Sequence, residues 1–338
     1  MDSGHVTVYG AYGHTGRFVV AELLRRGISP VLAGRDAARL ARFAADHPGL
    51  AHRAAPVDEP AMLRRVLKGS SVVINCAGPF LDTAVPVALA SVAVGAHYLD
   101  VSAEQAAVQE TYRMLDVVAT AAGVAVVPAL AFYGGLADLL VTAAAAEVQP
   151  TEVKIAIGLD RWWPTEGTRR TGARNTVPRV TVRDGQVVLL EDSEATTWRF
   201  PKPFGEQPVV PVPFSEVVTI ARHLAVNRLD SYLNTTALDD VRDDETPPPT
   251  AVDESGKSAQ RFVVDVEVGP HPVTTRISAS GRDIYAVTAP ILVAGAMQLL
   301  AGRARKYGAV APGEVFDVGE MLLQLADDVV IERSAVAD

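Results

Sequence analysis

The sequence predicts an α/β protein: a doubly wound parallel sheet, joined to an inserted α+β domain whose sheet is largely antiparallel. The first 130 residues alternate short β-branched runs with helical patterns, as parallel sheets with crossover helices do. A glycine-rich turn at residues 10–16 separates the first run from the first helical pattern. From about Thr151, apolar and polar residues alternate with a period of two, which is typical of half-buried antiparallel strands.

Six β/α units are expected in the first part of the chain. The first helix illustrates the reasoning. Val19, Val20, Leu23 and Leu24 recur at helical spacing and are expected to form one buried stripe, and Gly27 follows the last turn. The expected strands are Val6–Tyr9, Pro30–Ala33, Arg53–Val57, Val72–Asn75, Tyr98–Asp100 and Val124–Val127. The expected helices are Gly16–Arg26, Ala37–Asp46, Pro60–Leu67, Thr83–Val94 and Gln105–Ala122. These units predict a Rossmann domain over residues 1–130.

A second domain is expected over residues 131–283. Alternation in Val153–Leu159 and Phe262–Val268 predicts strands, and Asp184-Gly185 predicts a tight hairpin because both residues tolerate positive φ. The acidic and proline-rich stretch Asp239–Thr250 predicts a solvated loop. Helical patterns return after Asp283, through about Arg305 and again near Val318–Ala326.

Composition narrows the classes of function. The 338 residues are 49% hydrophobic and 21% charged, which excludes a mainly disordered chain, and a net charge of −9 argues against nucleic acid as the main partner. Cys76 is the single cysteine, so neither an intrachain disulfide nor a cysteine-based zinc site is expected, and no metal site is predicted. The start of the chain resembles no export signal, and Ala286–Ala301 is shorter than a membrane span. We therefore expect a cytoplasmic protein without membrane or nucleic-acid partners.

The glycine-rich turn has the pattern G-x-x-G-x-x-G. Gly10 permits the tight turn, Gly13 lets a pyrophosphate approach the backbone, and Gly16 lets the helix pack closely against the strand. The helix N-terminus supplies unpaired N–H groups and positive dipole. A plain glycine-rich turn is the alternative, but the position between strand and helix favours a dinucleotide site.

The end of the second strand indicates which dinucleotide is bound. A carboxylate there would hold the ribose hydroxyls of NAD, whereas Gly34 and Arg35 remove that charge and offer a guanidinium to a 2′-phosphate. NADP(H) is therefore the expected cofactor. In the alternative interpretation Arg35 is a solvated residue and Asp36 caps the next helix.

The loop after the fourth strand, Asn75–Phe80, should run beside the ribose and nicotinamide, since the carboxyl ends of the central strands flank the cofactor. Cys76 has no neighbouring histidine, so a structural role is favoured over a nucleophilic one.

Four stretches together resemble the saccharopine dehydrogenase-like, or saccharopine reductase-like, NADP-binding oxidoreductases: Val8–Gly16, Leu32–Asp36, Val73–Phe80 and His97–Glu104. In the second part of the chain, Glu166–Thr168 and Val310–Gly313 are similar to the family pattern more loosely, and Ser102 stands where many relatives carry glycine. The resemblance implies a Rossmann domain completed by C-terminal helices within residues 284–335, an inserted substrate domain, and often a homodimer through the sheet of that domain.

From the residues and the resemblance together, the positions expected to bind the dinucleotide are Gly10, Tyr12, Gly13, His14, Thr15, Gly16, Arg35, Asp58, Cys76, Ala77, Gly78, Pro79, Phe80 and Ser102.

Reduction by NADPH to an alcohol or amine also needs a proton donor. Asp100 ends the fifth strand and Tyr133 follows the sixth, so both are candidate catalytic residues. In the alternative interpretation Asp100 caps or hydrogen-bonds a loop, and Tyr133 is a packing residue. No tyrosine has a lysine four residues later, which excludes the short-chain dehydrogenase pair. Candidate substrate-binding residues are Glu104, Arg161, Gly167 and Thr168. Arg161 stands beside two tryptophans and is suited to bind a substrate carboxylate, with a solvated surface arginine as the alternative.

The sequence therefore predicts an NADP(H)-dependent oxidoreductase that reduces a C=N, C=O or C=C bond of a small metabolite. The alternative is a non-catalytic NADP(H) sensor of the NmrA type, which shares the early glycine motif. A second domain of more than 100 residues favours the enzyme, because a sensor needs a smaller one.

Overall fold

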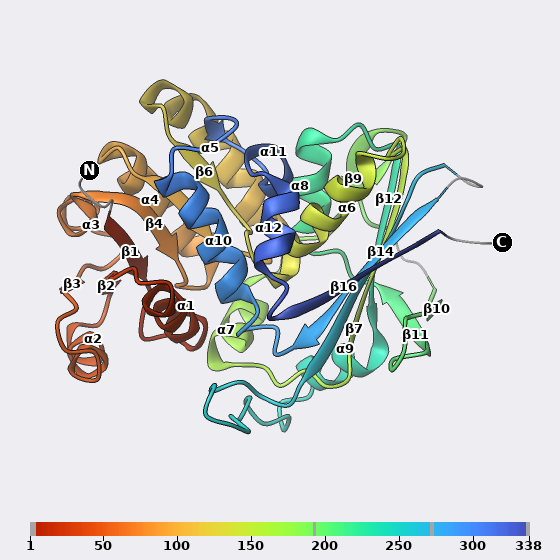
Figure 1. Ribbon diagram of the computed structural model, residues 1–338, viewed down its shortest axis with the longest axis horizontal. Helices are drawn as coiled ribbons and strands as arrows, with labels where there is room; N and C mark the ends of the chain where they lie inside the picture. The colour runs from red at the N-terminus through yellow and green to blue at the C-terminus, as the bar shows by residue number, and fades with distance from the viewer. Residues whose placement is uncertain (1–4, 192–193, 271–273, 336–338) are drawn as a thin grey trace.

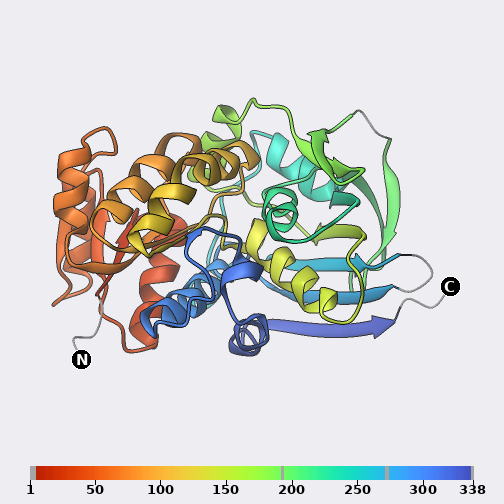
Figure 2. The ribbon, with the colours of Figure 1, turned by 90° about the horizontal axis from the view of Figure 1, so that it is seen from above.

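The computed structural model describes residues 5–191, 194–270 and 274–335 and shows two lobes, each built around one sheet (Figures 1 and 2). The first sheet has the order β15-β6-β5-β4-β1-β2-β3, and every neighbouring pair is parallel. Its strands are β1 (His5–Tyr9), β2 (Val31–Gly34), β3 (His52–Ala54), β4 (Ser70–Asn75), β5 (His97–Asp100), β6 (Ala125–Val127) and β15 (Gly308–Ala309). The strand order reverses between β1 and β4, which confirms the doubly wound fold.

Helices cover both faces of this sheet because its central strands are buried on both sides, whereas the edge strand β3 is largely exposed. Val6 and Val8 of β1 pack in one apolar cluster with α1 and α10, whereas Tyr9 packs in another with α3, α4 and α5. The helices of this lobe are α1 (His14–Arg25), α2 (Ala37–Ala45), α3 (Pro60–Leu67), α4 (Phe80–Ala93), α5 (Gln105–Ala122) and α10 (Thr288–Leu300). Figure 1 shows α10, from late in the chain, beside α1.

The second sheet is mixed but largely antiparallel. Its main path is β10-β11-β12-β7-β13-β14-β16, in which β12 and β7 pair in parallel, and β8 joins β12 and β9 off this path. The strands are β7 (Glu152–Leu159), β8 (Val180–Arg183), β9 (Gln186–Leu189), β10 (Thr196–Arg199), β11 (Glu206–Pro211), β12 (Arg228–Asn234), β13 (Arg261–Val268), β14 (Thr275–Arg282) and β16 (Val329–Ala335). The predicted hairpin is confirmed, with Asp184 and Gly185 at φ 50° and 73° between β8 and β9.

The remaining helices surround this second sheet or connect it to the first. A kinked turn, η1 (Phe132–Leu136), in which Tyr133 and Gly134 have non-helical backbone angles, leads into α6, which packs against β13 and β14. The helices are α6 (Ala137–Ala145), α7 (Glu166–Arg174), α8 (Glu216–His223), α9 (Thr235–Arg242), α11 (Pro312–Val315) and α12 (Val318–Gln324). Among the described residues, no helix is both long enough and apolar enough to cross a membrane.

Several details differ from the sequence expectations. Leu24, expected in the buried stripe of α1, is 37% exposed, and α4 begins at Phe80 rather than at Thr83. The predicted loop Asp239–Thr250 begins inside α9, because Asp240 is buried and accepts a hydrogen bond from the Trp162 N–H at 2.8 Å. The C-terminal segment contributes more than helices to the first domain: β15 extends the first sheet, and β16 pairs with β14 in the second. Sequence analysis missed both strands, because β15 has only two residues and β16 lies at an edge.

Candidate functional site

A cavity of about 490 Å³ lies between the lobes, at the carboxyl ends of the parallel strands. The first lobe lines it with the glycine-rich turn and with the loops after β2, β4 and β5. The second lobe contributes η1, α7 and several aromatic side chains. The predicted residues that line the cavity are Gly10, Tyr12, Gly13, His14, Thr15, Arg35, Cys76, Ala77, Gly78, Phe80, Glu104, Tyr133, Gly167 and Thr168.

The glycine-rich turn fits a dinucleotide. Gly10 has φ 85°, and a Cβ there would lie 2.9 Å from Ala77 N. A Cβ at Gly16 would lie 2.2 Å from Gly10 O, so Gly16 does not line the cavity but lets α1 pack onto the turn. Helix α1 begins at His14 without a side-chain cap, which leaves first-turn N–H groups for an anion. The His14 Nε2 is buried and has no partner among the described residues.

The loop after β2 presents two arginines at the cavity wall. Arg35 and Arg39 both line it, and the Arg39 guanidinium lies 4.9 Å from the centre of the Tyr12 ring. Asp36 caps α2 by accepting a hydrogen bond from Arg39 N at 2.9 Å, as the alternative interpretation of this loop held. Capping by Asp36 and cavity lining by Arg35 occur together. Sequence analysis missed Arg39. Its spacing of four residues from Arg35 was the signal that could have identified it as a second arginine near the phosphate.

The loop after β4 is held by buried polar contacts. Asn75 Nδ2 donates to Tyr98 Oη at 3.0 Å, and Asn75 Oδ1 accepts from Ala77 N at 3.0 Å. Burial raises the pKa of the Cys76 thiol, so the thiol stays neutral and the structural interpretation of this cysteine is favoured. Pro79 precedes α4 and lies outside the cavity lining.

The structure argues against a direct proton-transfer role for Asp100, because this residue is fully buried and does not line the cavity. Its carboxylate accepts hydrogen bonds from Ala129 N at 2.7 Å, Ser102 N at 2.9 Å and Tyr98 Oη at 2.8 Å. Burial raises its pKa to about 6. Asp100 thus holds the loops after β5 and β6 together, which agrees with the alternative interpretation that this residue hydrogen-bonds a loop.

Ser102 and Glu104 both lie in the loop after β5, but only Glu104 reaches the cavity. Glu104 lines the cavity and accepts a hydrogen bond from Phe80 N at 2.9 Å, while burial raises its pKa. Ser102 is fully buried outside the lining, where its carbonyl accepts from Ser215 Oγ at 2.9 Å. In the loop after β3, Val57 lines the cavity, but the exposed Asp58 next to it does not.

Tyr133 is the titratable predicted residue best placed for chemistry. It lies in η1, its side chain is 9% exposed, and its hydroxyl has no hydrogen-bond partner among the described residues. Its ring packs 4.2 Å from Phe214 and 5.4 Å from Trp162, measured between centroids. Burial raises the pKa of Tyr133 well above its ordinary value, so the group is a neutral hydroxyl that can donate.

Helix α7 reaches across the cavity from the second lobe. Tyr285 Oη lies 2.9 Å from Thr168 Oγ1 and accepts a hydrogen bond from Trp162 Nε1 at 3.1 Å, and the Tyr285 ring meets the His14 ring edge-on at 5.2 Å. An ion pair of 3.1 Å between Arg174 and Asp82 fixes the far end of α7 to α4. Sequence analysis did not find Tyr285, because no motif surrounds it.

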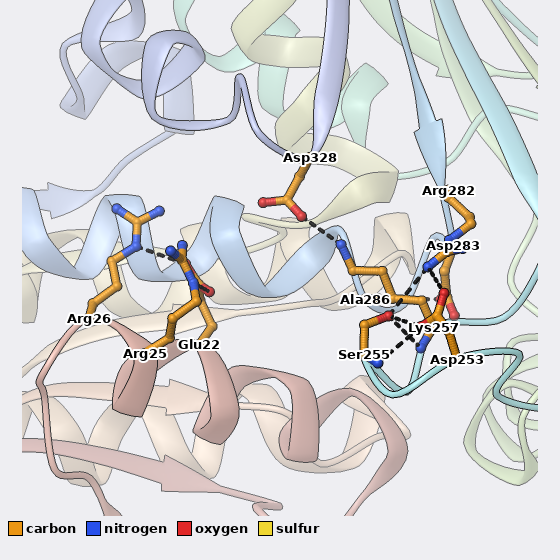
Figure 3. A network of polar contacts seen from close by, with 10 residues as sticks. All are labelled: Glu22, Arg25, Arg26, Asp253, Ser255, Lys257, Arg282, Asp283, Ala286 and Asp328. Carbon is orange, nitrogen blue, oxygen red and sulfur yellow. Dashed lines mark hydrogen bonds and ion pairs between the residues drawn. The ribbon is translucent and has the colours of Figure 1, made fainter.

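The backbone that carries Tyr285 is itself held by charged residues, shown in Figure 3. Asp283, at φ 61°, accepts from Tyr285 N and Ala286 N at 3.0 Å each. Nearby, Asp253 pairs with Arg282 at 2.6 Å and Lys257 pairs with Asp328 at 2.7 Å. These contacts fix one end of the cavity wall.

Arg161 was a candidate substrate residue, and the structure places it elsewhere. Its side chain is 55% exposed, pairs with Asp240 at 3.4 Å, and does not line the cavity. Arg179, which no sequence motif marked, lines the cavity instead. No cluster of His, Cys, Asp or Glu suited to a metal ion occurs in the described part of the chain.

Comparisons with known proteins agree with this geometry. Residues 6–127 match the family model of the saccharopine dehydrogenase NADP binding domain, which confirms the predicted resemblance and cofactor class. A saccharopine dehydrogenase-like oxidoreductase of Bos taurus is 29% identical over 153 residues, covering 40% of this chain and 36% of that protein. The Homo sapiens protein of the same description is 31% identical over 118 residues, covering 30% of this chain and 28% of that protein. The match thus spans well under half of either relative.

The whole fold has solved counterparts. An apo saccharopine dehydrogenase (L-Glu forming) from Saccharomyces cerevisiae aligns with a TM-score of 0.69 over 99% of this chain and 100% of that chain, at 13% identity. A meso-dapdh variant from Clostridium tetani aligns with a TM-score of 0.51 over 96% of this chain and 98% of that chain, at 11% identity. These likenesses confirm the predicted fold of both lobes.

Proposed function

We propose that this protein, whose residues 6–127 match the saccharopine dehydrogenase NADP binding domain, is an NADP(H)-dependent oxidoreductase that reduces a C=N, C=O or C=C bond of a small metabolite. One observation carries the proposal. A single cavity joins the dinucleotide-binding residues to the buried, unpartnered hydroxyl of Tyr133. A cofactor and an uncharged proton donor therefore face the same enclosed space.

The residues of the first lobe hold the cofactor in this proposal. The backbone at Gly10 and Gly13 and the first turn of α1 receive the pyrophosphate, and Arg35 with Arg39 receives the 2′-phosphate. When bound, NADPH supplies the hydride. The loop after β4 borders the path from the ribose to the second lobe.

Tyr133 holds a proton at Oη and donates it to the reduced substrate. Its hydroxyl is free to do so because no group among the described residues bonds it. The rings of Trp162 and Phe214 cover Tyr133 and exclude water, which strengthens polar contacts inside the cavity.

Oxidation of NADPH tests the proposal. The protein is incubated with NADPH and a panel of imines, 2-oxo acids and enoyl compounds, and loss of NADPH absorbance is followed. Turnover of at least one class supports the oxidoreductase. Tight NADPH binding without turnover across the panel overturns it and supports the non-catalytic sensor.

We also propose that the protein is a cytoplasmic homodimer that pairs through the sheet of the second lobe. The family resemblance supports the dimer, and the single cysteine supports a reducing compartment. Light scattering coupled to size-exclusion chromatography tests the assembly: a monomer across a concentration series contradicts it. Fluorescence microscopy of a tagged chain in its own cells tests the compartment.

A further inference from the structure

The part of the cavity around Tyr133, away from the polar side chains of α7, is largely apolar. Tyr133 and Phe214 form one wall, in ring contact with Trp162. The further aliphatic and aromatic residues that line this part are Ala131, Phe132, Val212, Leu233, Leu238, Val241 and Ile284, whereas α7 contributes polar side chains, Arg170 among them, to another part of the wall. An apolar surface of this kind favours a hydrocarbon or aromatic group over a charged chain.

One cation lies within this apolar region. The Arg179 side chain is half-buried, lines the cavity, and places its guanidinium 4.9 Å from the centre of the Phe214 ring. Its one hydrogen bond in the described part of the chain is to the carbonyl of Pro213. A guanidinium has five N–H donors, so most of those on Arg179 are available to a ligand.

No described carboxylate neutralises Arg179 at ion-pair distance, in contrast to the arginines around α7. Arg170 pairs with Glu166, and Arg174 pairs with Asp82. The charge of Glu216 acts on Arg179, but no ion pair joins the two side chains. Glu216 Oε1 accepts from Phe214 N at 2.8 Å, Oε2 is buried without a partner among the described residues, and burial raises the pKa of this carboxyl, which favours its neutral form. Because a half-buried cation without a counter-ion is costly, the geometry favours an anion supplied by the ligand.

We propose that the cavity takes a monocarboxylic acid with an apolar body, its carboxylate on Arg179 and its body against Trp162, Tyr133 and the aliphatic side chains. This inference rests on the proposed function, because it names the substrate class of the same site. It also explains why Arg179 lies on the ring that packs against Tyr133: the anion anchors the substrate beside the proton donor. A second carboxylate on a body that lies against these rings and aliphatic side chains would lose its water there and would be disfavoured.

Calorimetric titration of the NADP⁺-loaded protein tests the proposal with three probes that the enzyme cannot reduce: hydrocinnamate, its uncharged amide, and glutarate. Hydrocinnamate is expected to bind about 10- to 100-fold more tightly than the amide, the ratio for a charge-assisted hydrogen bond in a partly buried site. Glutarate is expected to bind more weakly than hydrocinnamate. Equal affinity for acid and amide, or equal affinity for hydrocinnamate and glutarate, overturns the proposal.

Two variants locate the effect. Arg179→Gln should remove the preference for the acid while the amide still binds; retention of the preference in this variant overturns the proposal. Arg199→Gln is the matched control, because Arg199 is an exposed arginine of the same lobe, 82% exposed and paired only with Glu206 among the described side chains. The wild-type comparison of acid and amide decides the matter even where a variant fails to fold.

The outcome is separable from that of the proposed function, because these probes require no turnover. A protein that binds hydrocinnamate through Arg179 but never oxidises NADPH refutes the reductase and keeps the acid site. A protein that oxidises NADPH with uncharged substrates alone refutes the acid site and keeps the reductase.

Discussion

Replacement of Arg35 by leucine should weaken the binding of NADPH and leave the binding of NADH nearly unchanged. Arg35 and Arg39 both line the cavity at the loop that follows β2, where the 2′-phosphate is expected. NADH lacks that phosphate, so a guanidinium that contacts it contributes nothing to NADH. The ratio of the two affinities therefore isolates the contact.

The size of the effect follows from the exposure of the side chain. A hydrogen bond to a charged group contributes about 1.5–3 kcal/mol. Arg35 is exposed to solvent, which screens the charge and favours the lower end of this range. A loss of about 1.5 kcal/mol raises the dissociation constant for NADPH about tenfold. Loss of Arg39 as well should increase the effect, and raising the salt concentration should reduce it.

The assay is fluorescence titration of each variant with NADPH and with NADH. Arg42→Leu is the matched control, because Arg42 lies on the same helix and is exposed, but does not line the cavity. Arg42→Leu should leave both affinities unchanged. Equal weakening of NADPH and NADH by Arg35→Leu would falsify the assignment of the phosphate to this loop.

Three further outcomes are expected. Tyr133→Phe should lower kcat in steady-state assays by about 100-fold or more, with NADPH affinity retained. Tyr112→Phe is the control, because it removes another buried hydroxyl, outside the cavity and without a partner among the described residues, and it should leave kcat unchanged. Similar losses of kcat in both variants would contradict the proton-donor role. Gly10→Ala should abolish NADPH binding in the same fluorescence titration, because a Cβ there would meet the loop after β4. Gly27→Ala is the control: Gly27 has a comparable φ of 76° and open space around it, so this change should cost only about 1 kcal/mol of stability. Retained NADPH binding in Gly10→Ala would refute the proposed pyrophosphate site at the glycine-rich turn. Because burial raises the pKa of Asp100 from 3.8 to about 6, the folded state binds more protons between these values, so this group makes stability fall by about 2 kcal/mol as pH rises from about 4 to 6. Urea unfolding across that range should show a shallower fall for Asp100→Asn, and equal slopes would exclude the effect.

Local patterns were sufficient to predict the first lobe except for its short edge strand β15. The glycine-rich turn, Arg35 and the loop after β4 all lie where the sequence placed them, because each depends on a strand, a turn and a helix that are adjacent in the chain. The resemblance to known oxidoreductases rests on the same continuous stretch and is confirmed over residues 6–127.

The substrate end of the cavity could not be predicted in the same way. Arg179 and Tyr285 are 106 residues apart, and only the packing of the second lobe against the first brings both to the cavity. Arg161 attracted attention because it stands beside two tryptophans, but Asp240 pairs with it from α9, and that partner cannot be inferred from spacing. Asp100 occupies the predicted strand end, yet the three hydrogen bonds to its carboxylate depend on loops that meet only in the folded chain.

The late strands β15 and β16 have a consequence for biosynthesis. Until residues 308–309 leave the ribosome, β6 has no neighbour on one side, and until residues 329–335 follow, β14 is likewise bare. A nascent chain halted before either point therefore carries open strand edges that invite pairing with other chains. A stop codon that removes β15 or β16 should thus yield insoluble protein rather than a slightly shortened folded chain.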